Sequence, residues 1–116
     1  MFFERRKIAR YTVSWPASLE ILERNPVSVR IREISLDGIS IVCDDLLDTG
    51  KRCDVTFIVP HPRGELGREI TARCEVARAA LSHDQNYHQV GLKFIALADV
   101  DSHALTVFIE HLSQLK

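Results

Sequence analysis

Two arginines near the start of the chain could bind an anionic ligand. Arg6 and Arg10 are four residues apart, so their side chains lie on one side of the chain whether it is helical or extended. A guanidinium carries paired N–H donors that match phosphate oxygens, and it can also pair with the O6/N7 edge of guanine or stack on a base. The pair therefore predicts a nucleotide site. Taken alone, however, a basic N-terminal run is more often a solvated tail.

A second polar group, made of Glu33, Ser35 and Gly38, could complete such a site. Glu33 and Ser35 are two residues apart, which places them on one face if the segment is a strand. Gly38 allows a tight turn or a close approach of the backbone to a ligand. An ordinary hairpin turn accounts for these residue types without any ligand, so the group gains meaning only together with the arginines.

The elements that would position these residues are short strands. Apolar and polar side chains alternate along six segments, which are separated by turn residues such as Asn25-Pro26 and Pro60-His61-Pro62. The first two segments form a hairpin in this interpretation, and Pro16 indicates an edge position or a bulge. No helical stretch lies between the segments, which favours an antiparallel barrel over parallel βαβ winding. The expected strands are 11–21, 27–32, 39–43, 53–59, 70–76 and 90–96.

Only the tail of the chain has helical periodicity. Asp99 or Asp101 is expected to cap this helix, whose apolar face must dock on the barrel or on a partner. The apolar residues at helical spacing are Leu105, Phe108, Ile109 and Leu112. The chain has 116 residues, of which 46% are hydrophobic, and this predicts one domain over 1–116. Its expected parts are an arm at 1–10, a barrel at 11–97 and a helix at 98–116.

Taken together, the two polar groups resemble the two-part signature of the PilZ family. The first part is Arg-Arg-Lys-Ile-Ala-Arg at 5–10, and the second is Glu-Ile-Ser-Leu-Asp-Gly at 33–38, after a strand pair. Val-Gly-Leu-Lys-Phe at 90–94 resembles the last barrel strand of that family, and 99–115 resembles its terminal helix. The resemblance covers nearly the whole chain. It implies a mainly β fold, a six-stranded antiparallel PilZ-type β-barrel with a C-terminal α-helix and a flexible arginine-rich arm.

The resemblance also implies a ligand, because PilZ domains are bacterial receptors for the second messenger cyclic di-GMP. Arg6 and Arg10 match the spaced arginines of the first motif, and Arg5 matches the arginine that often precedes them. Ser35 and Gly38 match the second motif, whose first position is usually Asp or Asn. Glu33 stands there instead, with a side chain one methylene longer and no amide donor. The expected ligand contacts are Arg5, Arg6, Arg10, Glu33, Ser35 and Gly38.

Three functions follow as alternatives. In the first, cyclic di-GMP orders residues 1–10 on the barrel, and the changed surface engages a protein effector in a process such as motility or biofilm formation. In the second, the departure at Glu33 marks a PilZ-like interaction module that does not bind the nucleotide, for example in type IV pilus assembly. The third, an oligonucleotide-binding barrel, is opposed by a net charge of -1 and by only one Trp, two Tyr and five Phe. No DNA or RNA partner is therefore expected.

The remaining residues favour binding over catalysis. No nucleophile, base and orienting group stand together, and the five histidines form no zinc-type cluster, so no enzyme, metal or cofactor is expected. Cys43, Cys53 and Cys74 are odd in number without a close pair, which is typical of reduced, buried thiols. Without a spanning stretch of about 18 apolar residues or a secretory signal, a cytoplasmic protein with no membrane insertion is expected.

Three further expectations concern single side chains and assembly. Trp15 alternates with core residues and is expected to be buried. Arg73 and Arg78 are assigned to a solvated strand face. Because the terminal helix could cap its own barrel or help to pair two chains, a monomer or a weak homodimer is expected.

Overall fold

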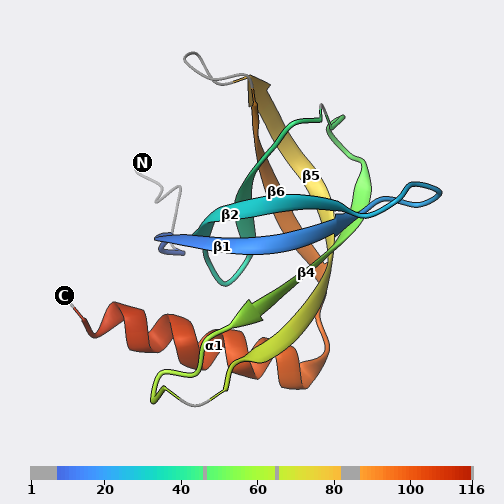
Figure 1. Ribbon diagram of the computed structural model, residues 1–116. Helices are drawn as coiled ribbons and strands as arrows, with labels where there is room; N and C mark the ends of the chain where they lie inside the picture. The colour runs from blue at the N-terminus through green and yellow to red at the C-terminus, as the bar shows by residue number, and fades with distance from the viewer. Residues whose placement is uncertain (1–7, 46, 65, 82–86, 116) are drawn as a thin grey trace, which may run out of the picture.

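The chain folds as a closed antiparallel barrel with one helix. The computed structural model describes residues 8–45, 47–64, 66–81 and 87–115. Around the barrel the strands follow the order β1-β2-β3-β6-β5-β4, and every neighbouring pair is antiparallel. Figure 1 shows the helix running beside β4 and β5. The elements are β1 (Tyr11–Glu20), β2 (Val27–Ile34), β3 (Gly38–Cys43), β4 (Arg52–Val59), β5 (Arg68–Leu81), β6 (His88–Ala96) and α1 (Asp99–Ser113).

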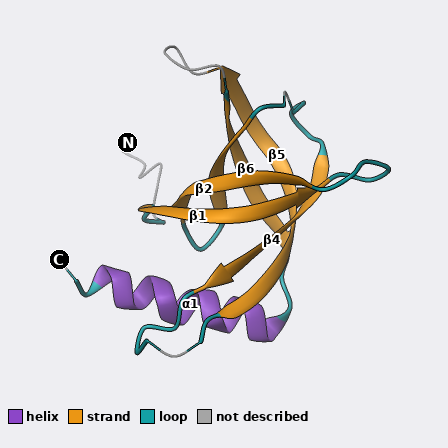
Figure 2. Cartoon of the chain, in the orientation of Figure 1, coloured by secondary structure: helices purple, strands orange, loops and turns teal. Residues whose placement is uncertain are grey.

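The fold class predicted from the alternating pattern is confirmed. The described part of the chain contains six strands and a single helix. Figure 2 shows the helix beside the strands of the barrel. The expected hairpin of the first two segments is present as the β1–β2 pair. All strands but β1 extend further than the pattern indicated. The extension is longest in β5, which covers Arg68–Leu81, while β2 continues to Ile34 and β6 begins at His88. The expected flexible arm falls largely on residues 1–7, which lie outside the described residues.

The barrel core consists of the inward side chains of every strand. Leu19, Ile31, Ile41, Val55 and Ile70 are fully buried in its interior. Period-two alternation puts these residues on one face of each strand, and closure of the sheet brings those faces together. The barrel therefore has a packed interior, and a ligand must bind on its surface.

Helix α1 packs against the barrel beside β4 and β5, close to its aromatic residues. Leu105, Phe108 and Ile109 are buried, as the helical spacing predicted. Trp15 is half-buried, and its ring centroid lies 6.2 Å from that of Phe57 and 5.3 Å from that of Phe108. The burial predicted for Trp15 is therefore only partial, although its side chain packs against the core.

The predicted helix cap is wrong. The N-cap residue is Ala98, which makes no side-chain capping bond, while Asp99 and Asp101 lie inside the first turn. Asp101 accepts a hydrogen bond of 2.7 Å from Nε of Arg68, at the start of β5, and is itself buried. The carboxylate thus ties the helix to the barrel through a charge-assisted bond, and its position in the first turn also suits the helix dipole.

The three cysteines are free and buried, as expected. Burial raises the pKa of the Cys53 thiol to about 11 and that of Cys74 to about 12. Burial also raises the pKa of Cys43. The three side chains therefore remain neutral thiols at physiological pH and contribute packing. No helix in the described part of the chain is long and apolar enough to cross a membrane.

Four register shifts interrupt the strand pairing. They lie between Thr12 and Trp15 in β1, Ile31 and Glu33 in β2, and at two places in the β5–β6 ladder. Pro16 lies beside the first shift and outside the β1–β4 ladder, which agrees with the edge or bulge predicted there. An extra residue on one strand reverses the side-chain alternation beyond it, so these shifts decide which residues face outward.

Candidate functional site

An open pocket of about 190 Å³ lies on the outer surface of the barrel, across β2, β3, β5 and β6. One residue from each strand forms a lateral row in it, because Glu33 pairs with Ser40, Ser40 with Gly91, and Gly91 with Arg78. We call this pocket the slot. Its floor is made of small residues, and charged side chains stand at both ends of the row. Arg10 lines the slot at the Glu33 end.

Glu33 faces outward because of a register shift. Val29 and Ile31 point into the core, and strict alternation would send Glu33 there too. The extra residue Arg32 turns Glu33 outward, and its side chain is 41% exposed. The hydrophobic residue Ile34 then takes the inward position and is fully buried. The shift thus places a carboxylate over the slot without exposing the core.

The first and second polar groups of the sequence meet at this carboxylate. Arg10 precedes β1 on the outward side, and its Nη1 lies 3.6 Å from Oε1 of Glu33. The two residues come from different parts of the expected signature, and both line the slot. Arg5 and Arg6 lie outside the described residues. Of the three predicted arginines, the structure therefore places Arg10 alone.

Ser35 holds the turn between β2 and β3. It is buried, and its hydroxyl donates to Oδ1 of Asp37 at 2.6 Å, with the carbonyl oxygen of Gly38 3.1 Å from the same hydroxyl. The backbone N–H of Asp37 donates back to the hydroxyl at 3.3 Å. Since β2 ends at Ile34, Glu33 and Ser35 do not share a strand face as the spacing suggested. Ser35 thus positions Asp37, which lines the slot.

Gly38 has a packing reason to lack a side chain. A Cβ atom there would lie 2.2 Å from the carbonyl oxygen of Leu92 in β6. Close approach of β3 to β6 therefore requires glycine at this position. The backbone N–H of Phe94 also donates to the carbonyl oxygen of Asp37 at 2.9 Å, which fastens the turn to β6.

The slot carries both signs of charge. The cationic side chains along it are Arg10, Arg78 and Lys93, and the acidic ones are Glu33 and Asp37. Carboxylates accept the ring and amino N–H groups of a base such as guanine, and guanidinium and ammonium groups bind phosphate. Such a surface suits a ligand that combines N–H donors with anionic groups. Within the described residues, no group of three or more potential metal ligands is present.

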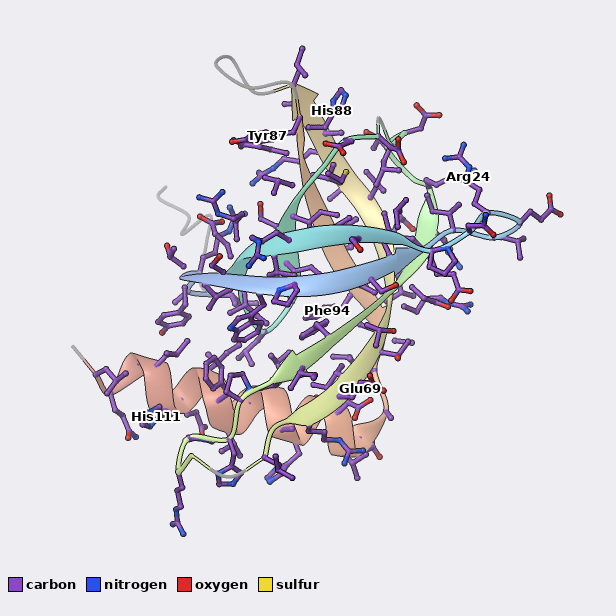
Figure 3. The ribbon with its side chains drawn as sticks, in the orientation of Figure 1. Arg24, Glu69, Tyr87, His88, Phe94 and His111 are labelled. Carbon is purple, nitrogen blue, oxygen red and sulfur yellow. The ribbon has the colours of Figure 1, made fainter. Side chains whose placement is uncertain are left out.

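A second hollow, of about 400 Å³, lies at the opposite end of the β1–β2 pair. We call it the hairpin hollow, and Figure 3 shows Arg24, one of its residues, at the tip of that hairpin. Two of its arginines have acidic neighbours, since Nε of Arg73 lies 3.1 Å from Oδ1 of Asp54 and Nε of Arg52 lies 3.7 Å from Oε1 of Glu75. Hydrogen bonding to this carboxylate raises the pKa of the Arg73 guanidinium. Of the predicted site residues that the structure describes, none lines this hollow.

Sequence reasoning missed Arg78 and Gly91 as residues of the slot. Arg78 was assigned to a solvated strand face, and it is exposed, but its side chain runs along the slot wall. A signal was present in the sequence, because apolar residues stand at both Val76 and Ala77 before Arg78 and break the alternation of β5. Such a break indicates a bulge, and bulges are frequent beside binding sites.

The closed six-stranded barrel with a C-terminal helix defines a class of small antiparallel barrel domains, and comparison with known families makes it specific. The family model of the PilZ domain matches residues 4–111. The chain therefore belongs to the PilZ domain family.

Solved structures with this fold include the Bacillus subtilis inhibitor of motility, MotI/DgrA, with a TM-score of 0.81 and 20% identity over 98% of this chain and 54% of that chain. The PilZ domain of YcgR from Escherichia coli, solved with c-di-GMP, gives a TM-score of 0.68 and 13% identity over 96% of this chain and 93% of that chain. The complex of K. pneumonia MrkH with c-di-GMP gives a TM-score of 0.75 and 16% identity over 97% of this chain and 54% of that chain.

The TM-scores of these three structures establish a common fold. This chain spans about half the length of the MotI/DgrA and MrkH chains, 54% in each case. No curated protein matches the sequence.

Proposed function

We propose that this domain is a cyclic di-GMP receptor whose ligand lies in the slot. The observation that supports the proposal is the contact between Arg10 and Glu33, one from each motif, 3.6 Å apart beside the slot floor. Structures with this fold have been solved with c-di-GMP, namely the YcgR PilZ domain and MrkH. Arg5 and Arg6 join Arg10 in this proposal as the residues that close over the ligand.

Each group of the slot has a role in this binding. The arginines neutralise phosphates and engage guanine faces or edges, while Glu33 accepts guanine N–H groups. Ser35 and Gly38 act by shaping the turn that carries Asp37 and by offering backbone groups. No bond in the ligand is made or broken, so the proposed activity is binding alone.

Calorimetric titration with cyclic di-GMP tests the proposal. Wild-type protein is expected to bind saturably. Arg6→Ala/Arg10→Ala is expected to lose about 3–6 kcal/mol of binding free energy, because each charged hydrogen bond contributes about 1.5–3 kcal/mol. A matched control, Arg24→Ala/Arg63→Ala, removes the same charge from residues that do not line the slot. Absence of binding by the folded wild-type protein would refute the receptor.

Signal output is proposed to pass through a protein effector. Ordering of residues 1–10 over the slot would change the surface beside β1 and β2 when the nucleotide binds. Amide exchange across residues 4–10 measures this step, with slower exchange expected in the presence of cyclic di-GMP. Equal exchange with and without bound ligand would exclude the switch while leaving ligand binding intact.

The alternative is an interaction module that does not bind the nucleotide. One feature favours it, since the carboxylate of Glu33 already partly neutralises the charge of Arg10. Such a module would retain its partner in a pull-down with the Arg6→Ala/Arg10→Ala variant. A receptor would instead lose the response of that interaction to cyclic di-GMP.

A further inference from the structure

Arg78 stands at the end of the slot opposite Glu33. In β5, Val76 pairs with Leu92, but Arg78 pairs with Gly91, so β5 has one more residue than β6 between these pairs. Val76 is fully buried, and strict alternation would carry the side chain of Arg78 into the core as well. The extra residue, Ala77, turns the guanidinium outward. An extra residue in β2, Arg32, turns Glu33 outward in the same way.

Because Gly91 has no side chain, the side chain of Arg78 can lie along the slot. A Cβ atom on Gly91 would lie 3.2 Å from both Cγ and Nε of Arg78. The arginine therefore lies flat over β6, and any side chain at position 91 would lift it. Glu33 and Arg78 are separated by three strand spacings, about 14 Å in total. Ser40 and Gly91 form a low floor between them.

Arg78 is also the cation of the slot whose donors are uncommitted. Arg10 lies beside Glu33, and Nζ of Lys93 lies 3.9 Å from Oε2 of Glu75. Within the described residues, Arg78 makes no ion pair or side-chain hydrogen bond. An outward guanidinium without an ion-pair partner can bind an anion.

We infer that Arg78 is a ligand-binding residue that holds a phosphate of the bound nucleotide at the end of the slot opposite Glu33. The inference rests on the proposed function and adds a residue outside both recognised motifs. Charge sets the orientation of the ligand, because the carboxylate of Glu33 repels phosphate and attracts base N–H groups. The phosphate therefore binds at the Arg78 end, where no carboxylate neutralises the guanidinium.

Titration of Arg78→Ala with cyclic di-GMP tests this inference. The dissociation constant is expected to rise by about 10- to 100-fold, the range for losing a hydrogen bond to a charged group. Arg78→Lys is expected to recover part of that loss, because an ammonium keeps the charge without the planar fork. Gly91→Ala keeps Arg78 in the sequence but displaces its side chain, and it is expected to weaken binding several-fold.

The matched control is Arg73→Ala on the same strand, since Arg73 faces Asp54 away from the slot. It is expected to bind as wild type does, and far-UV circular dichroism checks that every variant is folded. If the wild-type protein binds cyclic di-GMP and folded Arg78→Ala binds it with the same affinity, the role of Arg78 is overturned and the receptor function is not. Failure of the wild-type protein to bind would overturn the proposed function, and this inference with it.

Discussion

The slot and the hairpin hollow contain similar residues but differ in how those residues are arranged. Each has three basic side chains, and the hairpin hollow is the larger, at about 400 Å³ against about 190 Å³. In the hairpin hollow Arg73 pairs with Asp54, and Arg52 lies 3.7 Å from Glu75. In the slot the carboxylate and an uncommitted arginine stand at opposite ends. Size and arginine content therefore do not set the slot apart from the hairpin hollow, whereas the separation of Glu33 from Arg78 does.

Strand irregularity produces this difference. Register shifts immediately precede Glu33 in β2 and Arg78 in β5, and each turns outward a charged residue that alternation would bury. Around the hairpin hollow, Arg52 and Asp54 lie in the regular β4–β5 ladder opposite Glu75 and Arg73. A regular ladder places opposite charges directly across from each other, where they pair. A shifted ladder keeps them apart and available.

The largest expected effect concerns the slot floor. Gly38→Ala puts a Cβ 2.2 Å from the Leu92 carbonyl oxygen, a backbone atom that cannot move without opening the β3–β6 ladder. We expect a loss of about 3 kcal/mol in the free energy of unfolding, measured by urea denaturation.

Gly91→Ala is the matched control on the same floor. Its Cβ meets only the flexible side chain of Arg78, at 3.2 Å, so the expected loss is under about 1 kcal/mol. Equal stability of the two variants would show that the β3–β6 approach does not require glycine at position 38. The reason for glycine at position 38 would then be contact with the ligand and not the packing of β3 against β6.

A smaller effect is expected in the hairpin hollow, which Cys53 lines. Burial raises the pKa of this thiol to about 11, so the folded protein keeps a proton that the unfolded chain releases near pH 9. The stabilisation is complete below pH 9 and is lost as the pH rises toward 11. We expect Cys53 to account for a decrease of about 1 kcal/mol in the free energy of unfolding by pH 10.

Comparison with Cys53→Ala isolates this contribution, because the other groups that titrate above pH 9 are common to both proteins. The variant should lose less stability between pH 8.5 and pH 10 than wild type does. Identical pH profiles would mean that the thiol ionises freely, and the hairpin hollow would then be a reactive site instead of a packed one.

The sequence predicted most of the fold because its pattern is local. Alternation along β1 to β6 and helical spacing in α1 each follow from nearest-neighbour geometry. Asp101 was assigned to a cap because its partner, Arg68, is 33 residues away in the sequence and could not be inferred from spacing. A carboxylate at the start of a helix can cap the helix or pair with a distant cation, and only the packed structure distinguishes these two roles.

The candidate site was partly predictable for the same reason. Glu33 and Arg10 were found from their motifs, whereas the row that joins Glu33 to Arg78 depends on the registers of three ladders. An extra residue in a strand moves every later side chain to the opposite face, and local periodicity does not say which strand absorbs it. Arg78 was therefore missed although the broken alternation before it was visible.

The smallest expected effect concerns the ion pair between Arg10 and Glu33. Glu33→Gln removes the charge that faces Arg10 but keeps an acceptor oxygen for a base N–H. Exposed ion pairs contribute up to about 1 kcal/mol, so cyclic di-GMP should bind up to about fivefold more tightly once Arg10 is released. Asp54→Asn, which releases Arg73 in the hairpin hollow, should leave the affinity unchanged. Weaker binding by Glu33→Gln would instead mean that the carboxylate charge itself holds the ligand, and that Arg10 and the base compete for it.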